Sequence, residues 1–158
     1  MVKTVSMCGK MDLIKDNKER RRQVWKFPDY YRKTWQCEPE HSPDEAALEE
    51  HLDILTKVMP GFVINHGLTT ESLYIDYKII PGVPANTFPH TEQFIDKIYN
   101  YCINNINNTS PYAHGDWSLS NIILTGEDVS IVDWDNVAIS KPADVIIKLH
   151  SDLVSVWR

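Results

Sequence analysis

Hydrophobic and polar positions alternate with a period of two in the first 36 residues of the chain. Apolar and polar residues exchange there in short runs, interrupted by turn sequences at 8–10 and 16–19, and this pattern is typical of strands in a small antiparallel sheet. Pro28-Asp29 is expected to end the last of these strands. The predicted strands are residues 4–7, 11–14 and 23–27.

A helical period begins after a polar loop at 39–43. Leu48, Leu52 and Leu55 recur at helical spacing with acidic residues between them. This pattern predicts a helix from about 44 to 58, which Ser42 or Asp44 can cap. The segments expected after it are strands at 62–66 and 72–80, a rigid connector at 81–86, and helices at about 91–106 and 143–157.

Size and composition indicate one compact protein of at most two small lobes. The chain has 158 residues, of which 42% are apolar and 24% charged, and no apolar run approaches the roughly 18 residues that span a bilayer. The N-terminus lacks the apolar segment of a signal peptide, and the three cysteines follow no pairing pattern. We therefore expect a cytoplasmic protein with unpaired thiols and no membrane partner.

The net charge of −6 hides an uneven distribution. Residues 1–36 hold ten Lys and Arg against four Asp and Glu, whereas residues 37–158 hold six against eighteen. The basic run Lys18-Glu19-Arg20-Arg21-Arg22 is most simply a solvated turn. It can also attract a polyanion, so nucleic acid stays open as a partner, although it is not the favoured one.

Oxygen-bearing side chains gather between residues 114 and 135. His114-Gly115-Asp116 is followed five residues after the aspartate by Asn121, and an expected hairpin of two apolar strands then leads to Asp133 and Asp135. A carboxylate can accept a proton or bind a hard cation, and a carboxamide oxygen is a neutral ligand for the same cation. This arrangement suits metal-assisted phosphoryl transfer.

These residues and their spacing resemble the signature of the aminoglycoside phosphotransferase and choline kinase group. His114-Gly115-Asp116, Asn121 and Val132-Asp133-Trp134-Asp135 match its pattern of His-Gly-Asp, four residues, Asn, and then a hydrophobic-Asp-aromatic-acid tetrapeptide. The resemblance implies an α+β, bilobal protein-kinase-like fold. It divides the chain into an N-terminal nucleotide-binding lobe at 1–80, with a five-stranded antiparallel sheet and one helix, a hinge at 81–86, and a truncated, mostly helical catalytic lobe at 87–158.

The same resemblance implies roles for the polar residues of the catalytic lobe. Asp116 would be the catalytic base, and Asn121 and Asp133 would hold Mg²⁺. His114 belongs to the same catalytic loop, where hydrogen-bonded support of the loop is favoured over proton transfer. Asp135 is expected behind the metal ligands, with a second cation or simple exposure as the alternatives.

In the N-terminal lobe, the resemblance assigns Lys26 to the nucleotide phosphates. Lys26 is flanked by apolar residues, and its partner would be a glutamate of the following helix, for which Glu49 is chosen over Glu45. Lys33 competes with Lys26 because aromatic residues alternate with it.

The remaining nucleotide contacts are expected on both sides of that lysine. Gly9 and Lys10 would cover the phosphates, and the backbone of Asp76, Tyr77 and Lys78 would receive the adenine of ATP. A single glycine stands where the family has a glycine-rich loop, which is a departure from its pattern.

Two features concern the C-terminal end. Pro142-Ala143-Asp144 resembles, with one residue fewer, the Pro-x-x-Asp element that braces the catalytic loop of the family, and a helix N-cap is the alternative for Asp144. The chain also ends one helix after the metal-binding aspartate, whereas relatives continue with helices that build the substrate pocket. The apolar helix at 143–157 therefore needs cover from the domain core or from a second copy in a homo-oligomer.

The sequence thus predicts an ATP- and Mg²⁺-dependent kinase that moves the γ-phosphoryl group to a hydroxyl of a small molecule. Two alternatives stay open, a protein kinase and a nucleotide-binding pseudokinase with a regulatory role. The acceptor itself is not specified by any motif.

Overall fold

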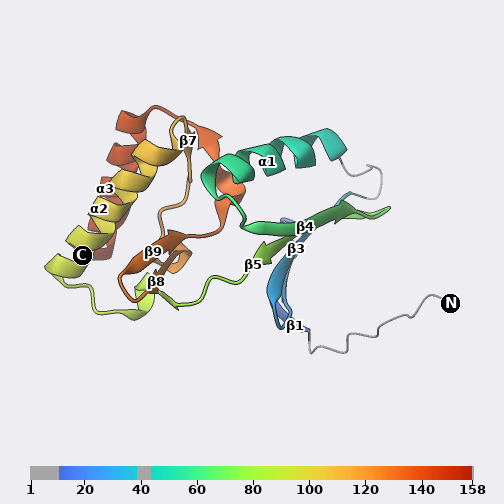
Figure 1. Cartoon of the computed structure of the whole chain (residues 1–158), viewed down its shortest axis with the longest axis horizontal. Helices are drawn as coiled ribbons and strands as arrows, with labels where there is room; N and C mark the ends of the chain where they lie inside the picture. The colour runs from blue at the N-terminus through green and yellow to red at the C-terminus, as the bar shows by residue number, and fades with distance from the viewer. Residues whose placement is uncertain (1–10, 39–43, 158) are drawn as a thin grey trace. The chain divides into compact units, whose positions relative to one another are not determined.

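The computed structural model describes residues 11–38 and 44–157, and the chain forms two compact units (Figure 1). The first unit is Met1–Ile79 and the second is Ile80–Arg158. The first unit contains a five-stranded antiparallel sheet and one helix, which confirms the α+β fold class and the architecture expected for this part of the chain.

The sheet of the first unit has the strand order β1-β2-β3-β5-β4. Neighbouring strands are antiparallel, and Lys33 of the third strand lies between Val24 and Ile75 in the register. Because side chains alternate between the faces of a sheet, these three share one face. The elements are β1 (Asp12–Asn17), β2 (Arg22–Lys26), β3 (Tyr30–Gln36), α1 (Glu45–Val58), β4 (Val63–Leu68) and β5 (Ser72–Lys78).

Strand β3 was not among the predicted strands. Pro28-Asp29 does not end the pairing but forms a tight turn, in which the N–H of Phe27 donates to the carbonyl of Tyr30 at 2.9 Å. The chain therefore returns at once as β3, whose alternating side chains complete the sheet. The strand expected at 4–7 lies outside the described residues.

Helix α1 covers one face of the sheet, as its apolar stripe predicted. The carboxylate of Asp44 accepts a hydrogen bond from the N–H of Ala47 at 3.0 Å, which confirms the expected N-cap. Leu48, Leu55 and Val58 are buried on the inner side. These helix residues form the core together with three buried residues of the sheet and its connections, Phe62, Ile75 and Tyr77.

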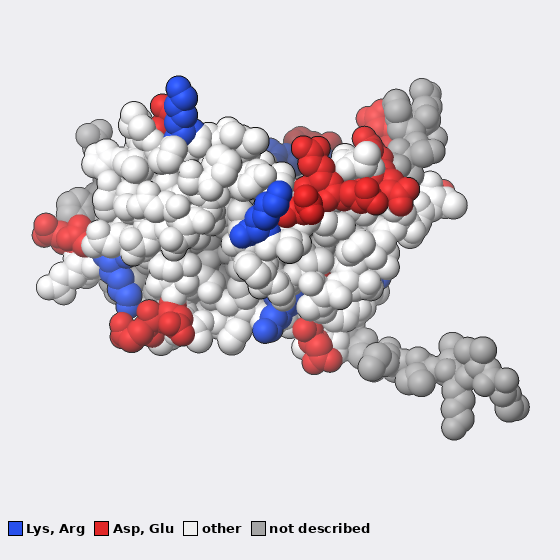
Figure 2. All heavy atoms as spheres, turned by 45° about the horizontal axis from the view of Figure 1, so that its top comes forward, with Lys and Arg blue, Asp and Glu red and all other residues white. Residues whose placement is uncertain are grey.

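The outer side of α1 is acidic, and Figure 2 shows Asp and Glu side chains gathered over this helix. Glu49, Glu50 and Asp53 line an open groove of about 680 Å³, to which β4 contributes His66. Burial of the leucine stripe and solvation of the acidic stripe together explain why this segment is an amphipathic helix.

The second unit packs two long helices beside a small sheet. Helices α2 and α3 lie side by side, and Figure 1 shows them next to the β8–β9 hairpin. Strands β6, β8 and β9 form one antiparallel sheet, while β7 and β10 form a separate pair. The elements are β6 (Val83–Pro84), η1 (Ala85–Thr87), α2 (Glu92–Thr109), β7 (Tyr112–Ala113), η2 (Leu119–Asn121), β8 (Ile122–Thr125), β9 (Asp128–Ile131), η3 (Trp134–Asn136), β10 (Ala138–Ile139) and α3 (Pro142–Trp157).

The core of the second unit joins the two helices to the loops that carry the candidate residues. Ile98 and Cys102 of α2 and Leu149 of α3 are fully buried, and Val145 and Leu153 of α3 are nearly so. The stripe of α3 is thus covered by the unit itself, and the predicted homo-oligomer remains untested. Burial raises the pKa of the Cys102 thiol to about 12.

The segment expected as a hinge is built into the second unit. Val83 and Pro84 pair with Leu124 and Ile123 of β8, and Ala85 is completely buried. Among the described residues, no helix combines the length and apolar character needed to cross a membrane.

Candidate active site

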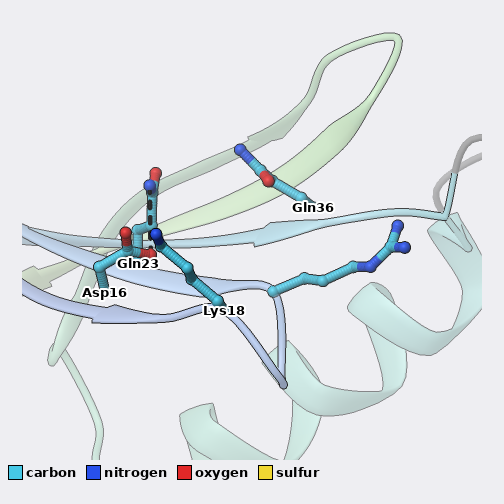
Figure 3. Close-up of a pocket in the computed structure, with 5 residues that line it drawn as sticks. Asp16, Lys18, Gln23 and Gln36 are labelled. Carbon is cyan, nitrogen blue, oxygen red and sulfur yellow. Dashed lines mark hydrogen bonds between the residues drawn. The ribbon is translucent and has the colours of Figure 1, made fainter.

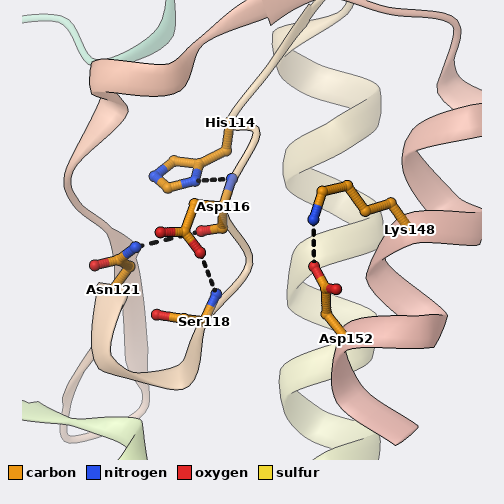
Figure 4. A network of polar contacts seen from close by, with 6 residues as sticks. All are labelled: His114, Asp116, Ser118, Asn121, Lys148 and Asp152. Atoms are coloured by element: carbon orange, nitrogen blue, oxygen red, sulfur yellow. Dashed lines mark hydrogen bonds and ion pairs between the residues drawn. The ribbon is translucent and has the colours of Figure 1, made fainter. Parts of the chain in front are cut away.

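Two loops of the second unit carry the residues expected to be catalytic. The first runs from His114 to Asn121 between β7 and β8, and the second begins at Val132, directly after β9. In the first, the carboxylate oxygen Oδ1 of Asp116 accepts a hydrogen bond from the N–H of Ser118 at 3.3 Å, which closes the loop behind the carboxylate (Figure 4). Asp116 itself is half-buried.

His114 connects the two loops. Its Nδ1 accepts a hydrogen bond from the N–H of Asp116 at 3.2 Å, and its Nε2 donates to the carbonyl of Val132 at 2.7 Å. An N–H can only donate and a carbonyl can only accept, so these partners require a neutral imidazole with its proton on Nε2. Both ring nitrogens are therefore used within the protein, which favours the supporting role over proton transfer.

The surroundings of His114 keep it neutral. The side chain is fully buried, and its ring lies 5.6 Å from that of Trp117 and 4.7 Å from that of Trp134. This burial lowers the pKa of His114, against the opposing influence of the Val132 carbonyl and the carboxylates of Asp133 and Asp116.

Gly115 allows the two loops to approach closely. Its φ of +83° lies in a region that residues with side chains rarely adopt, and a Cβ at this position would collide with the backbone oxygen of Asn136 in η3. A side chain at position 115 would therefore push the loops apart. Sequence spacing alone contains no sign of this contact.

Asn121 forms a second connection between the loops. The N–H of Val132 donates to the backbone carbonyl of Asn121 at 2.8 Å, which places Asp133 next to the end of the catalytic loop. The side chain of Asn121 donates from Nδ2 to the carbonyl of Asp116 at 3.3 Å. Since that carbonyl needs a donor, the Oδ1 atom of Asn121 is turned away from it and is available as a ligand.

Asp133 has an unusual backbone. Its φ of 65° and ψ of 61° are left-handed, a conformation that costs a residue other than glycine about 1–2 kcal/mol. Such strain persists only where the surroundings determine it, and both backbone groups of the preceding Val132 are held by the first loop. Trp134 adds to this by donating from its indole to the carbonyl of Ile131 at 3.1 Å.

Asn121 and Asp133, the residues expected to hold Mg²⁺, carry oxygen atoms of the kind that a hard divalent cation binds. Carboxylate and carboxamide oxygens are the ligands that Mg²⁺ uses in proteins. Asp135 follows in the first turn of η3 and is half-buried, and its expected role behind the ligands stays a prediction. Residues 11–38 and 44–157 contain no group of three or more His, Cys, Asp and Glu poised to hold a metal.

The structure does not bring Lys26 and Glu49 together. Both side chains are exposed and no ion pair joins them among the described residues. Lys26 ends β2, where its ammonium lies 5.8 Å from the ring of Tyr31, whereas Glu49 borders the groove that contains His66 of β4. β2 and β4 are separated by two strands, and the predicted pair is not formed in this structure. Glu45, the alternative, is exposed in the first turn of α1.

Lys33 occupies the position that the sheet order favours for the nucleotide lysine. In protein kinases this lysine belongs to the third strand. The third strand of this sheet, directly before α1, is β3, so the competing candidate fits better than Lys26. The Nζ atom of Lys33 lies 5.4 Å from the ring centre of Tyr77 on the face covered by α1.

The three residues expected to receive adenine lie inside or at the end of β5. Asp76 and Tyr77 pair with β3 on one side and β4 on the other. The N–H of Lys78 donates to the carbonyl of Phe62 at 2.8 Å. Pairing within the sheet therefore uses backbone groups of this segment, which argues against the predicted contacts of these groups with adenine.

The side chain of Asp76 has a structural role. It is 3% exposed and accepts two hydrogen bonds from Arg32, at 2.7 and 2.9 Å. This bidentate pair raises the pKa of Arg32, with its hydrogen bond to Asp76 as the largest cause.

Two other predictions concern loop residues. Gly9 and Lys10 lie outside the described residues, and the turn between β1 and β2, at residues 18–21, contains no glycine. Asp144 is exposed in the first turn of α3 and makes no side-chain hydrogen bond to a described residue, so the expected brace is absent there. Its charge still favours the positive end of the helix. On the same helix, Lys148 and Asp152 form an ion pair of 2.8 Å (Figure 4).

Similarity to known proteins is visible at the level of structure. A solved structure of the bifunctional kinase-methyltransferase WbdD matches 87% of this chain, with a TM-score of 0.62 and 16% sequence identity. A structure of monomeric WbdD matches 96% of this chain, with a TM-score of 0.59 and 11% sequence identity. The kinase PK-1 of Cydia pomonella granulovirus matches 82% of this chain, with a TM-score of 0.48 and 18% sequence identity. No protein-family model matches the chain, and no curated protein sequence does.

The likeness to WbdD shows a protein-kinase-like fold, as the motif order predicted. The chain spans 35% to 49% of the length of these WbdD chains and 53% of PK-1. The fold is therefore shared with part of a larger protein.

Proposed function

We propose that this chain is an ATP- and Mg²⁺-dependent phosphotransferase, similar to aminoglycoside phosphotransferases and choline kinases, that acts on a hydroxyl group of a small molecule. The observation that carries this proposal is the double connection between the two loops. Val132 accepts a hydrogen bond from His114 and donates one to the carbonyl of Asn121, which supports a joint role of Asp116, Asn121 and Asp133.

In the proposed reaction, Asp116 accepts the proton of the acceptor hydroxyl. The hydroxyl oxygen then forms a bond to the γ-phosphorus of ATP while the bond from that phosphorus to the ADP oxygen breaks. Asn121 and Asp133 would hold Mg²⁺, which neutralises charge on the phosphate oxygens. His114 positions the loop, and its neutral ring leaves the hydroxyl proton to Asp116.

The test is turnover by the full chain with ATP and Mg²⁺ over a panel of sugars, amino alcohols and aminoglycosides. ADP release that depends on one class of acceptor is the expected result. Asp116→Asn should lower kcat by about 10²–10⁴-fold, the usual contribution of a general base. Asp96→Asn, on the exposed side of α2, removes the same charge and should leave kcat unchanged. Absence of both nucleotide binding and transfer would overturn the proposal.

A regulatory nucleotide-binding module is the second candidate. It is favoured by the separation of Lys26 and Glu49 and by the absence of glycine from the turn between β1 and β2. Thermal stabilisation by ATP and Mg²⁺ without turnover on any acceptor would support it over the enzyme.

A protein kinase is less well supported. Members of that class prefer arginine at the position of Gly115, where the close approach of Asn136 leaves no space for a side chain. A labelled protein band after incubation with labelled ATP would favour this class instead.

A further inference from the structure

The face of the five-stranded sheet opposite α1 presents aromatic and polar side chains in rows. The register places Leu13, Trp25, Arg32, Asp76 and Asn65 side by side across the sheet. The neighbouring row includes Asp16, Gln23 and Thr34. We call this surface the outer sheet face. Within the first unit, the described residues place no helix over it.

A basic turn borders the outer sheet face. Lys18, Arg20 and Arg21 lie between β1 and β2, and Glu19 is the one acidic residue among them. Lys18 and Arg20 form no ion pair with a described residue. Arg21 has a φ of +49°, a conformation that glycine or asparagine usually occupies, so a cation stands where the turn itself favours glycine.

A groove of about 370 Å³ joins this turn to the outer sheet face. Its walls include Lys18, Asp16 and Gln23 at one end and Gln36 of β3 at the other (Figure 3). Arg21 also lines it and is held by a hydrogen bond from its guanidinium to the carbonyl of Cys37 at 3.1 Å. Asp16 is engaged by the side-chain amide of Gln23 at 3.5 Å. The groove thus offers two cations and amide donors against the single carboxylate of Asp16, and this positive balance suits a phosphate group.

Trp25 lies two residues from Gln23 along β2, which corresponds to about 6.6 Å of strand. Its ring is half-exposed and has no aromatic or cation–π partner among the described residues. Arg32 beside it is oriented by Asp76 and stacks over Tyr74 at 4.1 Å, so its guanidinium plane is fixed. A flat, unoccupied indole next to a fixed guanidinium is a stacking platform for a base.

We propose that the outer sheet face binds single-stranded nucleic acid, with a phosphate in the groove of Lys18 and Arg21 and a base on Trp25. The groove joins a broad sheet face that includes Trp25, and an extended strand can contact both, whereas a small molecule would fill the groove alone. A duplex conceals the faces of its bases, so only a single strand can use the indole.

This surface differs from the site of the proposed phosphotransferase. Lys33 and Val24 lie on the face covered by α1, while Gln23 and Trp25 alternate with Val24 and lie on the opposite one. Binding to the outer sheet face therefore does not require Asp116, and loss of phosphoryl transfer in Asp116→Asn should leave it intact.

Fluorescence anisotropy of the full chain with labelled 15-residue oligo-dT and oligo-U tests the proposal. Binding should weaken with salt, with a log–log slope of about −1.4 for two phosphate contacts. Lys18→Ala combined with Arg21→Gly should reduce that slope towards zero, and glycine keeps the backbone conformation of the turn. Lys57→Ala on α1, which removes one charge from the other side of the same unit, should change nothing.

Trp25→Ala should weaken binding about ten-fold, within the range for base–aromatic stacking, and Trp25→Phe should weaken it less. Thermal unfolding of each variant identifies any that fail to fold, and Trp25→Phe then provides the comparison. Binding of a duplex of equal length as tightly as the single strand would overturn the proposal. Equal affinity of parent, Trp25→Ala and Trp25→Phe, or absence of binding at 50 mM salt, would overturn it as well.

Discussion

Asn121 and Val132 are joined by a backbone hydrogen bond of 2.8 Å that links the end of one loop to the start of another. The carbonyl of the same valine accepts a hydrogen bond from His114 at 2.7 Å. The backbone N–H and carbonyl of Val132 are therefore both hydrogen-bonded, immediately before Asp133. The position of the expected metal ligand depends on these two bonds as much as on its own side chain.

Stability should depend on pH through His114. Burial lowers its pKa in the folded protein below the ordinary value of about 6.5, so the unfolded chain binds the proton first as the pH falls. Stability is therefore fully present above about 6.5 and decreases as the pH falls from there towards the folded pKa. Urea unfolding between pH 8 and pH 5 should show this decrease, and His114→Gln should lose it.

Exposed His66 is the control for that measurement. The His66→Gln variant should still lose stability below pH 6.5, because the side chain of His66 is exposed and the buried His114 is unchanged. An identical pH dependence in the parent and in His114→Gln would contradict the assignment of this effect to the buried imidazole.

Gly115 and Gly126 offer a matched comparison of two glycines with positive φ. Gly115 has φ of +83° and faces the backbone of Asn136, whereas Gly126 has φ of +60° and open space around its Cα. Gly126→Ala should lower the free energy of unfolding by about 1 kcal/mol, the conformational term alone. Gly115→Ala should lower it by about 2 kcal/mol or more, since the collision is added.

The same pair of variants separates folding from function. Phosphoryl transfer should be lost in Gly115→Ala at a temperature where that variant is still folded, because the two loops are displaced from each other. Gly126→Ala should retain transfer. Equal effects of the two substitutions on stability and on transfer would show that the contact with Asn136 has no importance.

Asp133→Asn should abolish the part of the ATP-induced stabilisation that depends on Mg²⁺. In the parent, ATP at ten times its Kd with Mg²⁺ present should add about 1.4 kcal/mol to the free energy of unfolding, and EDTA should remove most of this gain. The asparagine keeps the shape of the side chain but removes its charge. Asp135→Asn should reduce the gain less, because Asp135 is expected to act behind the ligands.

The sequence predicted the local elements well because their determinants lie close together in the chain. Asp44 caps α1 as expected, and the three helices lie where the apolar stripes placed them. Strand β3 was missed because Pro28-Asp29 can end a strand or turn it back, and only pairing with the distant β5 decides between the two.

For the candidate site, the sequence predicted the two loops but not the contacts between them. The spacing of Asp116, Asn121 and Asp133 is local and was sufficient to identify the two loops. The closeness of Gly115 to Asn136 arises from tertiary packing that no spacing encodes. The same holds for Arg32 and Asp76, which meet across neighbouring strands although they are 44 residues apart in sequence.

Lys33 and Lys26 provide the comparison that decides which lysine serves the nucleotide. Lys33 belongs to β3, the strand that directly precedes α1, whereas Lys26 ends β2 and is exposed. Lys33→Met should weaken ATP binding or lower kcat by at least ten-fold, because a cation that contacts phosphate contributes charge-assisted hydrogen bonds. Lys26→Met, with the same change in charge and shape, should have an effect of less than about two-fold. The reverse order in isothermal titration and turnover measurements would restore the assignment that the apolar neighbours of Lys26 suggested.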